Sequence, residues 1–501
     1  MAPQNAAVPG LLSLPRITTL LASLLVAVGA GTNYVFSAYA PQLAARLNIN
    51  HTQLNVVGLA ANVGVYASGP VWGRIVDARG PRIPLAFSFI FLLLGYTGIR
   101  HFYDAGVPEG TSLSSLGLAL LIACSFMTGV GGNAGSSGAV NSTAKSFPDK
   151  ARATTTGIVL SGFGLSAFFF STIAHSLYPG DTSSLLFLLA CGTALASSIG
   201  FFFVRAIPLA ATEIEHTEVP ESEATLFSHL NDSHTPLLNQ PAEEYPPSSP
   251  RSRSRSLSRG RKAQAFEGPN VYGRALWLNP DFWLLFAIFA LLSGTGLMYI
   301  NNVGSIAQAL FAKGSPTYDE VQASRWQAAQ VSVISIMNFS GRIVIGVLSD
   351  NLKNRFGLPR SYSTIFVSTL FFFSQLLATQ ISDVQDLWKA SMLVGFSYGT
   401  IFGLWPTVCI EFFGLSHFSE NWGYLSLSPL VGGNLFSIAF GRNLDAHAPV
   451  ERSTGRAHQC LEGRSCYVAT LGLTSTACFA AILLSAFVTW RERRKLLAGR
   501  L

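Results

Sequence analysis

The sequence predicts an all-α integral membrane protein in which twelve transmembrane helices form two pseudo-symmetric bundles of six. Composition supports this fold class, because only 12% of the 501 residues are charged and 49% are hydrophobic; a soluble domain has about 25% charged residues. The apolar residues are grouped into windows of about 20, enough for a helix to cross about 30 Å of hydrocarbon. Motifs of the first half also recur in order in the second half.

A duplicated loop motif marks the two halves. GRIVDARGPR (residues 73–82) and GVLSDNLKNRFGLPR (residues 346–360) both follow an apolar stretch. In each, an Asp comes four residues after a Gly, and a Pro-Arg pair follows. Other residues recur at an offset of about 266, and such an ordered set predicts a duplicated six-helix unit. The matching pairs are Gly129 with Gly395, Phe147 with Phe413, Gly157 with Gly423, and Tyr34 with Tyr299.

The apolar windows place the helices along the chain. The expected spans are 17–40, 54–76, 83–101, 115–140, 154–177, 184–205, 281–304, 328–349, 362–380, 388–411, 422–443 and 468–490. The first is too long for a signal peptide and lacks a small-residue cleavage site, so we expect it to remain as a helix.

Lys and Arg in the connecting loops predict the orientation. Positive loops usually stay in the cytosol, so both termini are expected there. The loop after the eleventh span dissents, with three arginines on the opposite side. The loops that support the assignment contain Arg74, Arg79 and Arg82; Lys145, Lys150 and Arg152; Lys353, Arg355 and Arg360; and RERRK at 491–495.

The chain is expected to comprise an N-terminal bundle (1–208), a central cytosolic loop (209–275) and a C-terminal bundle with a short cytosolic tail (276–501). The loop is acidic, then proline-rich, then basic, ending near RSRSRSLSRGRK (251–262). Such a composition buries no core, so we expect a disordered tether that kinases modify rather than a nucleic-acid-binding segment. SHTPLL (233–238) looks like the acidic-dileucine signals of fungal vacuolar proteins, which favours sorting adaptors as partners and the vacuolar membrane over the plasma membrane.

No enzyme, metal or cofactor signature is present. The sequence has no Ser-His-Asp, metal-spaced or nucleotide-binding constellation, and its six cysteines are scattered. Cys460 and Cys466 lie in one loop and form either a disulfide or a pair of free thiols. GVGGNAGSSG (129–138) follows no strand and has no closing Lys-Ser/Thr, so it predicts close helix packing rather than phosphate binding.

The loop motif, its duplication and the long central loop resemble the major facilitator superfamily. Within it, NYVFSAYAPQL (33–43), GRIVIGVLSD (341–350), EFFG (411–414) and NWG (421–423) are similar to fungal nodulin-like transporters, the monocarboxylate-transporter-homologue group. The resemblance spans both halves. It implies two six-helix bundles in a lipid bilayer and a central cavity that takes a small solute by alternating access.

Arg342 is the main candidate for binding substrate. It lies two helical turns, about 12 Å, before Asp350 and therefore inside the hydrocarbon, where an unpartnered guanidinium costs at least about 3 kcal/mol. The resemblance implies carboxylate binding, because monocarboxylate and oxalate carriers have an Arg here with a Gly four residues later, as Gly346 follows Arg342. The planar guanidinium suits that task. The alternative is that Arg342 bonds to carbonyls of neighbouring helices.

The sequence departs from proton-coupled monocarboxylate carriers at two places. Asn338 stands where they have an Asp, and the first span has no Lys beyond Arg16. No Asp or Glu lies in the middle of a span, so no proton-coupling site is expected. Facilitated diffusion, exchange, and symport with the substrate's own proton therefore remain open.

Other polar residues inside the spans are candidates for lining the cavity. A hydrated cavity would satisfy their hydrogen bonds, and bonding between helices is the alternative for each. The candidates are Asn33, Tyr34, Asn62, Asn133, Tyr299, Asn301, Asn302, Asn338 and Asn434.

Charged residues near the loop motifs are expected to hold the two halves together on the cytosolic side. Asp77 and Asp350 lead because the repeat reproduces them. Lys145 and Glu411 occupy equivalent positions, which suggests that opposite charges bridge the bundles. For the outer arginines, solvated loop charges worth under about 1 kcal/mol each are the alternative. The remaining candidates are Arg74, Arg79, Arg82 and Arg360.

Together these features predict a secondary transporter of a monocarboxylate or other small organic anion. A metabolite or drug antiporter is one alternative, although GIVLSGFGLSA (157–167) lacks the Gly-Pro pair usual in that span of antiporters. A membrane sensor or scaffold that signals through its long loop is the other.

Overall fold

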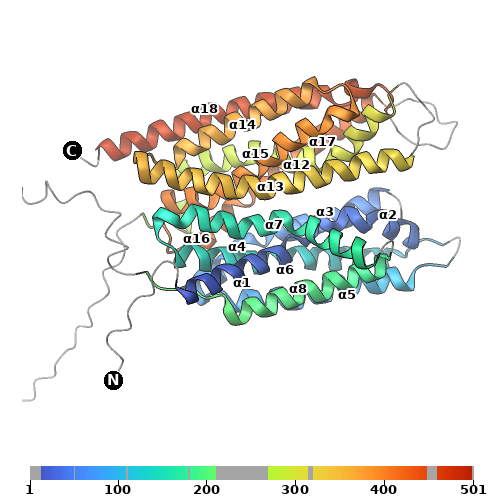
Figure 1. The fold of residues 1–501 in the computed structure, drawn as a ribbon, viewed down its shortest axis with the longest axis horizontal. Coiled ribbons are helices and arrows are strands. Elements are labelled where there is room, and N and C mark those ends of the chain that lie inside the picture. Colours follow the sequence, from blue (N-terminus) through green and yellow to red (C-terminus); the bar gives the residue numbers. More distant parts are fainter. Residues whose placement is uncertain are drawn as a thin grey trace, which may run out of the picture. The chain divides into compact units, whose positions relative to one another are not determined.

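The computed structural model describes residues 13–49, 51–108, 111–178, 181–209, 269–313, 320–447 and 460–498. Every regular element within these ranges is a helix, as the composition predicts (Figure 1). Most of the expected central loop, including SHTPLL and the Arg-Ser run, falls in residues 210–268 and lies outside the described residues. Its last residues, 269–275, are described and contact the second half.

Helices from the first half form one group and helices from the second half form another (Figure 1). The first group contains α1 (Leu14–Ala30), η1 (Thr32–Val35), α2 (Phe36–Leu47), α3 (His51–Ala67), α4 (Gly69–Arg79), α5 (Arg82–Ala105), α6 (Ser115–Ser146), α7 (Asp149–Leu177) and α8 (Thr182–Phe203). The second contains α11 (Arg274–Trp277), α12 (Pro280–Phe311), α13 (Glu320–Phe356), α14 (Ser361–Gln380), η2 (Val384–Asp386), α15 (Leu387–Phe413), α16 (Phe418–Leu425), α17 (Ser428–Ala446), η3 (Gly463–Cys466) and α18 (Val468–Ala498).

All twelve expected spans coincide with helical segments. Ten helical segments of the described chain are long and apolar enough to cross a membrane. The second span is interrupted at Ser68 between α3 and α4, where Pro70 occupies the first turn of the new helix. Proline suits that position because the first amides of a helix have no intrahelical acceptor. The eleventh span is divided between α16 and α17.

Glycines allow equivalent helix crossings in both halves. A Cβ atom on Gly129 of α6 would overlap the carbonyl oxygen of Ala61 in α3. A Cβ atom on Gly395, the equivalent residue in α15, would meet the carbonyl oxygen of Ile334 in α13 at 2.8 Å. Close packing of small residues brings the helix backbones together at both crossings. The predicted role of the glycine-rich run is therefore confirmed.

The start of α1 and the end of α18 lie at the same end of the helices, on the left of Figure 1. In the first half, the Ile207 amide after α8 donates to Ser146 Oγ at the end of α6 (2.9 Å). In the second half, Asp281 at the start of α12 pairs with Arg491 of α18 (2.8 Å) and with Lys495. We refer to this end as the termini end.

Candidate functional site

Arg342 lies in α13 between the two halves and is only 1% exposed. Its Nε donates to Asn338 Oδ1 one turn earlier in the same helix (3.0 Å). Its Nη1 donates to the carbonyl oxygen of Leu160 in α7, across the boundary between the halves (2.6 Å). The close approach of α7 is possible because Gly157 lies against the Arg342 backbone, where a Cβ would come within 2.5 Å of the carbonyl oxygen.

Aromatic rings from both halves enclose the guanidinium. Its central carbon lies 5.7 Å from the ring centre of Phe163 in α7 and 5.4 Å from that of Phe402 in α15. Each of these rings also packs against a tyrosine. The ring centres of Tyr34 and Phe163 are 5.7 Å apart, and those of Tyr398 and Phe402 are 4.9 Å apart. Ring faces carry partial negative charge, so these walls stabilise a cation without neutralising it.

Three phenol groups lie within electrostatic range of one another and of Arg342, on Tyr34 in η1, Tyr66 in α3 and Tyr398 in α15. Tyr398 is fully buried, and its hydroxyl interacts with the hydroxyls of Tyr34 and Tyr66. The three hydroxyls therefore form one polar group beside the guanidinium.

The charge of Arg342 is not balanced by the described part of the protein. No Asp or Glu there forms an ion pair with it, and its electrostatic neighbours are the three tyrosines. By contrast, the buried Arg360 pairs with two carboxylates. A buried cation without a counter-ion is costly inside a membrane, so this site is complementary to an anion.

The structure brings only some of the other candidates close to this arginine. Asn338 contacts it directly and Tyr34 contacts the Phe163 wall. Asn33, next to Tyr34, donates from Nδ2 to Asn62 Oδ1 (2.9 Å), while its own Oδ1 is buried without a partner in the described chain. Asn133 donates to Ser68 Oγ at the break between α3 and α4 (3.1 Å).

Three of the remaining candidates form hydrogen bonds elsewhere in the second half. Tyr299 is fully buried and its hydroxyl bonds to Ser391 Oγ (3.1 Å). Asn302 and Asn434 donate to the carbonyls of Met298 and Leu430, each one turn earlier in its own helix (both 2.8 Å). Asn301 and Asn434 are exposed. None of these four residues contacts Arg342 in the described chain. For Tyr299, Asn302 and Asn434 the geometry therefore favours the alternative, local bonding.

The Asp350 latch joins α13 to the second turn of α7 at the termini end. We use the name for Asp350 with its partners Ala153, Thr154 and Arg360. Asp350, 4% exposed, accepts hydrogen bonds from the amides of Ala153 (3.2 Å) and Thr154 (2.7 Å) and from Thr154 Oγ1 (2.7 Å). Arg360 Nη2 also donates to Asp350 (3.0 Å). Hydrogen bonds from the Arg360 guanidinium and from neutral donors together stabilise this buried carboxylate.

Arg360 extends this latch across the boundary. Its Nη1 pairs with Asp149 Oδ1 (2.9 Å), and its Nη2 donates to the Asp149 carbonyl (2.7 Å). Lys353 also pairs with Asp149, at 2.7 Å. Lys353 and Arg360 of the second half therefore both form ion pairs with Asp149 of the first half.

The Asp77 latch is the counterpart, at the equivalent place in the repeat. We use the name for Asp77 with Asn141, Ser419, Glu420 and Arg74. Asp77 Oδ2 accepts the amide of Glu420 in α16 (2.8 Å), and Asn141 bridges Asp77 Oδ1 (2.7 Å) and Ser419 Oγ. Arg74 pairs with Glu420 (2.9 Å). Gly73 faces Ser419 so closely that a Cβ would overlap its carbonyl. The offset of 266 relates Ala153 and Thr154 to Ser419 and Glu420, so the two latches are equivalent.

Lys145 and Glu411 do not bridge the halves. Lys145 pairs with Asp77 of its own half (3.2 Å), and Glu411 pairs with Lys353 of its own half (2.8 Å). Each is nearer to an opposite charge on a neighbouring helix of the same bundle. Arg79 and Arg82 are exposed, as expected for solvated loop charges.

Sequence inspection missed Asp149 and Glu420, which make the bridging ion pairs. Both occupy the first turn of a helix at the boundary, a position where acidic residues are enriched. It also missed Tyr66, Tyr398, Phe163 and Phe402. Tyrosine within an apolar span is a weaker signal than asparagine, because aromatic residues are common in buried helices.

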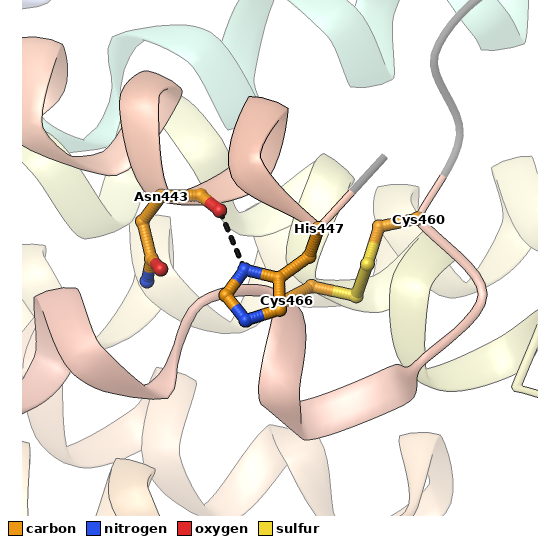
Figure 2. The surroundings of a disulfide bond; sticks show 4 residues. All are labelled: Asn443, His447, Cys460 and Cys466. Carbon is orange, nitrogen blue, oxygen red and sulfur yellow. Dashed lines mark hydrogen bonds between the residues drawn. A yellow bond between two sulfur atoms is a disulfide. The ribbon is translucent and has the colours of Figure 1, made fainter. Parts of the chain in front are cut away.

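Cys460 and Cys466 form a disulfide just before α18, which settles the open alternative (Figure 2). The bridge closes a short loop beside the end of α17, where His447 Nδ1 lies 2.9 Å from the carbonyl oxygen of Asn443 (Figure 2). Both half-cystines are buried among Leu310, Phe440 and Tyr467. Disulfides persist in oxidising compartments.

Comparisons with known proteins agree with the arrangement. A sequence model of the Major Facilitator Superfamily matches residues 21–437. The chain is 25% identical over 511 residues to an uncharacterised membrane protein of Saccharomyces cerevisiae, covering 90% of each chain. It is 26% identical over 458 residues to the probable transporter MCH1 of Wickerhamomyces anomalus, covering 88% of this chain and 83% of that one.

Solved structures show the same fold. A bacterial homologue of the iron transporter ferroportin, in an outward-facing state, matches with a TM-score of 0.58 and 13% identity over 95% of this chain and 99% of that one. The proton:xylose symporter XylE matches with a TM-score of 0.53 and 12% identity over 92% of this chain and 94% of that one. At such low identity the likeness concerns the fold alone.

Proposed function

Because this chain belongs to the major facilitator superfamily and is a multi-pass integral membrane protein, we propose that it is a secondary transporter of a small organic anion, bound through one carboxylate by Arg342. The observation that carries the proposal is the buried guanidinium with no acidic partner in the described chain. Transport of a small solute follows from the family, and the anionic substrate is the finer step proposed here.

The free groups around Arg342 define the ligand. Nε and Nη1 are engaged by Asn338 and Leu160, whereas no hydrogen bond within the described chain engages Nη2. A carboxylate can take Nη2 and share Nη1 in the bidentate geometry that guanidinium favours. The hydroxyls of Tyr34, Tyr66 and Tyr398 provide further polar groups near the guanidinium. One cation with phenol groups suits a singly charged, hydrogen-bonding organic acid better than a dianion.

Helices α7 and α13 connect this site to the Asp350 latch. Arg342 contacts Leu160 of α7, and Asp350, two turns further along α13, binds the second turn of α7. A carboxylate that shares Nη1 would compete with the Leu160 carbonyl and remove a bond that holds α7 against α13. Substrate would then shift the equilibrium between states, because it binds better where that bond is broken.

Uptake from a mixed pool of solutes tests the proposal. Liposomes with and without the protein would receive monocarboxylates, dicarboxylates, neutral sugars and organic cations, and mass spectrometry would report their contents. We expect monocarboxylates to accumulate only in the presence of protein. Accumulation of neutral or cationic solutes alone would contradict an anion site, and no accumulation of any solute would favour a sensor or scaffold.

We also propose that both termini face the cytosol and that the protein resides in the vacuolar membrane. The positive loops and SHTPLL support this assignment, and the disulfide lies in the loop between α17 and α18, away from the termini end. A pH-sensitive fluorescent protein fused to the C-terminus should fluoresce at the vacuolar membrane, because on the cytosolic side the acidic lumen would not quench it. Quenched fluorescence would reverse the orientation, and fluorescence at the cell surface would refute the vacuolar assignment.

A further inference from the structure

The segment at residues 269–273, which directly precedes α11, is bound to the turn between α15 and α16. We call this segment the clasp. The Val271 amide donates to the carbonyl oxygen of Phe413 (3.0 Å), and the Val271 carbonyl accepts from Asn421 Nδ2 (2.8 Å). Tyr272 stacks on His417 with ring centres 3.7 Å apart. The clasp therefore contacts both the end of α15 and α16, the helix that contributes Ser419 and Glu420 to the Asp77 latch.

Gly414 is required for this contact. It ends α15 with φ of 95°, in the left-handed region that glycine adopts most readily. A Cβ at this position would overlap the carbonyl oxygen of Pro269. Backbone conformation and space thus both demand glycine where the clasp crosses the turn.

The clasp and the first half contact largely different residues of α16. His417, Asn421 and Tyr424 are spaced at i, i+4 and i+7 and so share one stripe. They meet Tyr272, Val271 and, for Tyr424, Trp277 of α11 (ring centres 5.0 Å apart). Ser419, Glu420 and Gly423 instead face Asn141, Asp77 and Gly69 of the first half, and Arg74 also donates to the Tyr424 hydroxyl (3.1 Å).

We propose that the clasp is a regulatory strap that holds α16 in its latched position and so couples the central loop to the Asp77 latch. The helix has only eight residues, too short to be stable alone, so its position depends on the surfaces that enclose it. The first half provides one surface and the clasp provides the other. A pull on the clasp from the preceding loop would remove one wall of α16 and release the Asp77 latch. This role does not depend on which solute is carried.

Hydrogen–deuterium exchange of the full-length protein tests the strap. Asn421→Ala removes the side-chain bond to the clasp and leaves the Ser419 and Glu420 contacts with the first half. We expect amides of α16 to exchange about fivefold faster, the effect of one buried hydrogen bond. Amides at the end of α4, on the other side of the latch, should also exchange faster.

Ser146→Ala is the matched control. Ser146 anchors the opposite end of the loop by accepting from the Ile207 amide, and that contact lies on α6 rather than α16. Exchange in α16 should remain at the wild-type rate in this variant. An equal increase in both variants would show that any loss of a loop anchor loosens α16 and would overturn the proposal.

Gly414→Ala provides a second variant with its own control, Gly441→Ala in α17, where an added Cβ meets nothing within 4 Å. We expect faster exchange in α16 only for Gly414→Ala. Unchanged exchange in α16 for Asn421→Ala would refute the strap. Faster exchange confined to α16, with α4 unaffected, would refute the coupling between the clasp and the Asp77 latch.

Discussion

Replacement of Arg342 by Gln is expected to lower uptake of the transported anion by about 30-fold or more. Glutamine keeps a polar side chain beside Asn338 but removes the charge that would pair with the substrate carboxylate. Loss of one member of a buried charged pair costs about 2–5 kcal/mol, and about 1.4 kcal/mol corresponds to tenfold. Initial uptake rates in proteoliposomes, normalised to inserted protein, would measure the effect.

Two further variants separate charge from geometry and from general damage. Arg342→Lys keeps the charge without the planar fork, so we expect intermediate uptake. Arg100→Gln removes an arginine that pairs with Asp104 (3.3 Å) and Ser183 (3.1 Å), far from α13 in sequence, and should leave uptake unchanged. If Arg342→Gln transports the anion at the wild-type rate, Arg342 serves only to join α13 to α7 through Leu160.

Replacement of Asp350 by Asn is expected to open the termini end. The amide keeps the shape of the carboxylate, but its NH2 group would face an N–H donor of Ala153, Thr154 or Arg360. Removal of one partner from a buried ion pair costs about 3–5 kcal/mol. The cost falls on the latched state, because the other state does not make these contacts. We therefore expect the population to shift away from the latched state by about 100-fold.

The native Cys409 can report this opening. It is fully buried in α15, and its thiol lies within electrostatic range of Asp77 at the boundary between the halves. In a background without the other free cysteines (Cys124, Cys191 and Cys478) and with the disulfide kept, Asp350→Asn should make labelling by a small maleimide at least tenfold faster. Labelling at the wild-type rate would show that the Asp350 latch does not hold this end closed.

The two latches should differ in strength. Asp350 receives three hydrogen bonds from the second turn of α7, whereas Asp77 receives one from a backbone amide of α16. Asp77→Ala should therefore accelerate Cys409 labelling less than Asp350→Asn does. Asp386→Asn is the matched control, because Asp386 is half exposed and its ion pair within the described residues is with nearby Lys389. Exposed pairs contribute under about 1 kcal/mol.

The spans and the duplication could be predicted from the sequence because both are local properties of the chain. A window of apolar residues determines whether a helix crosses the membrane, whichever helices later surround it. The offset of 266 links Ala153 to Ser419 and Gly157 to Gly423, and the structure places both pairs at equivalent contacts. A charged residue in the middle of a span can also be recognised from the sequence, because burying Arg342 there without a partner has a high free-energy cost.

The sequence by itself therefore determined the membrane class and the two equivalent halves, and it singled out Arg342, Asp77 and Asp350 as candidates. Only the tertiary structure decided the partners of these residues: Leu160, Phe163 and Phe402 around Arg342, and Asp149 and Glu420 in the bridging ion pairs. The physical reason is that partners depend on which helix faces meet, and glycines and helix ends far apart in the chain set those faces. For the same reason Lys145 and Glu411, equivalent in the repeat, each pair within their own half.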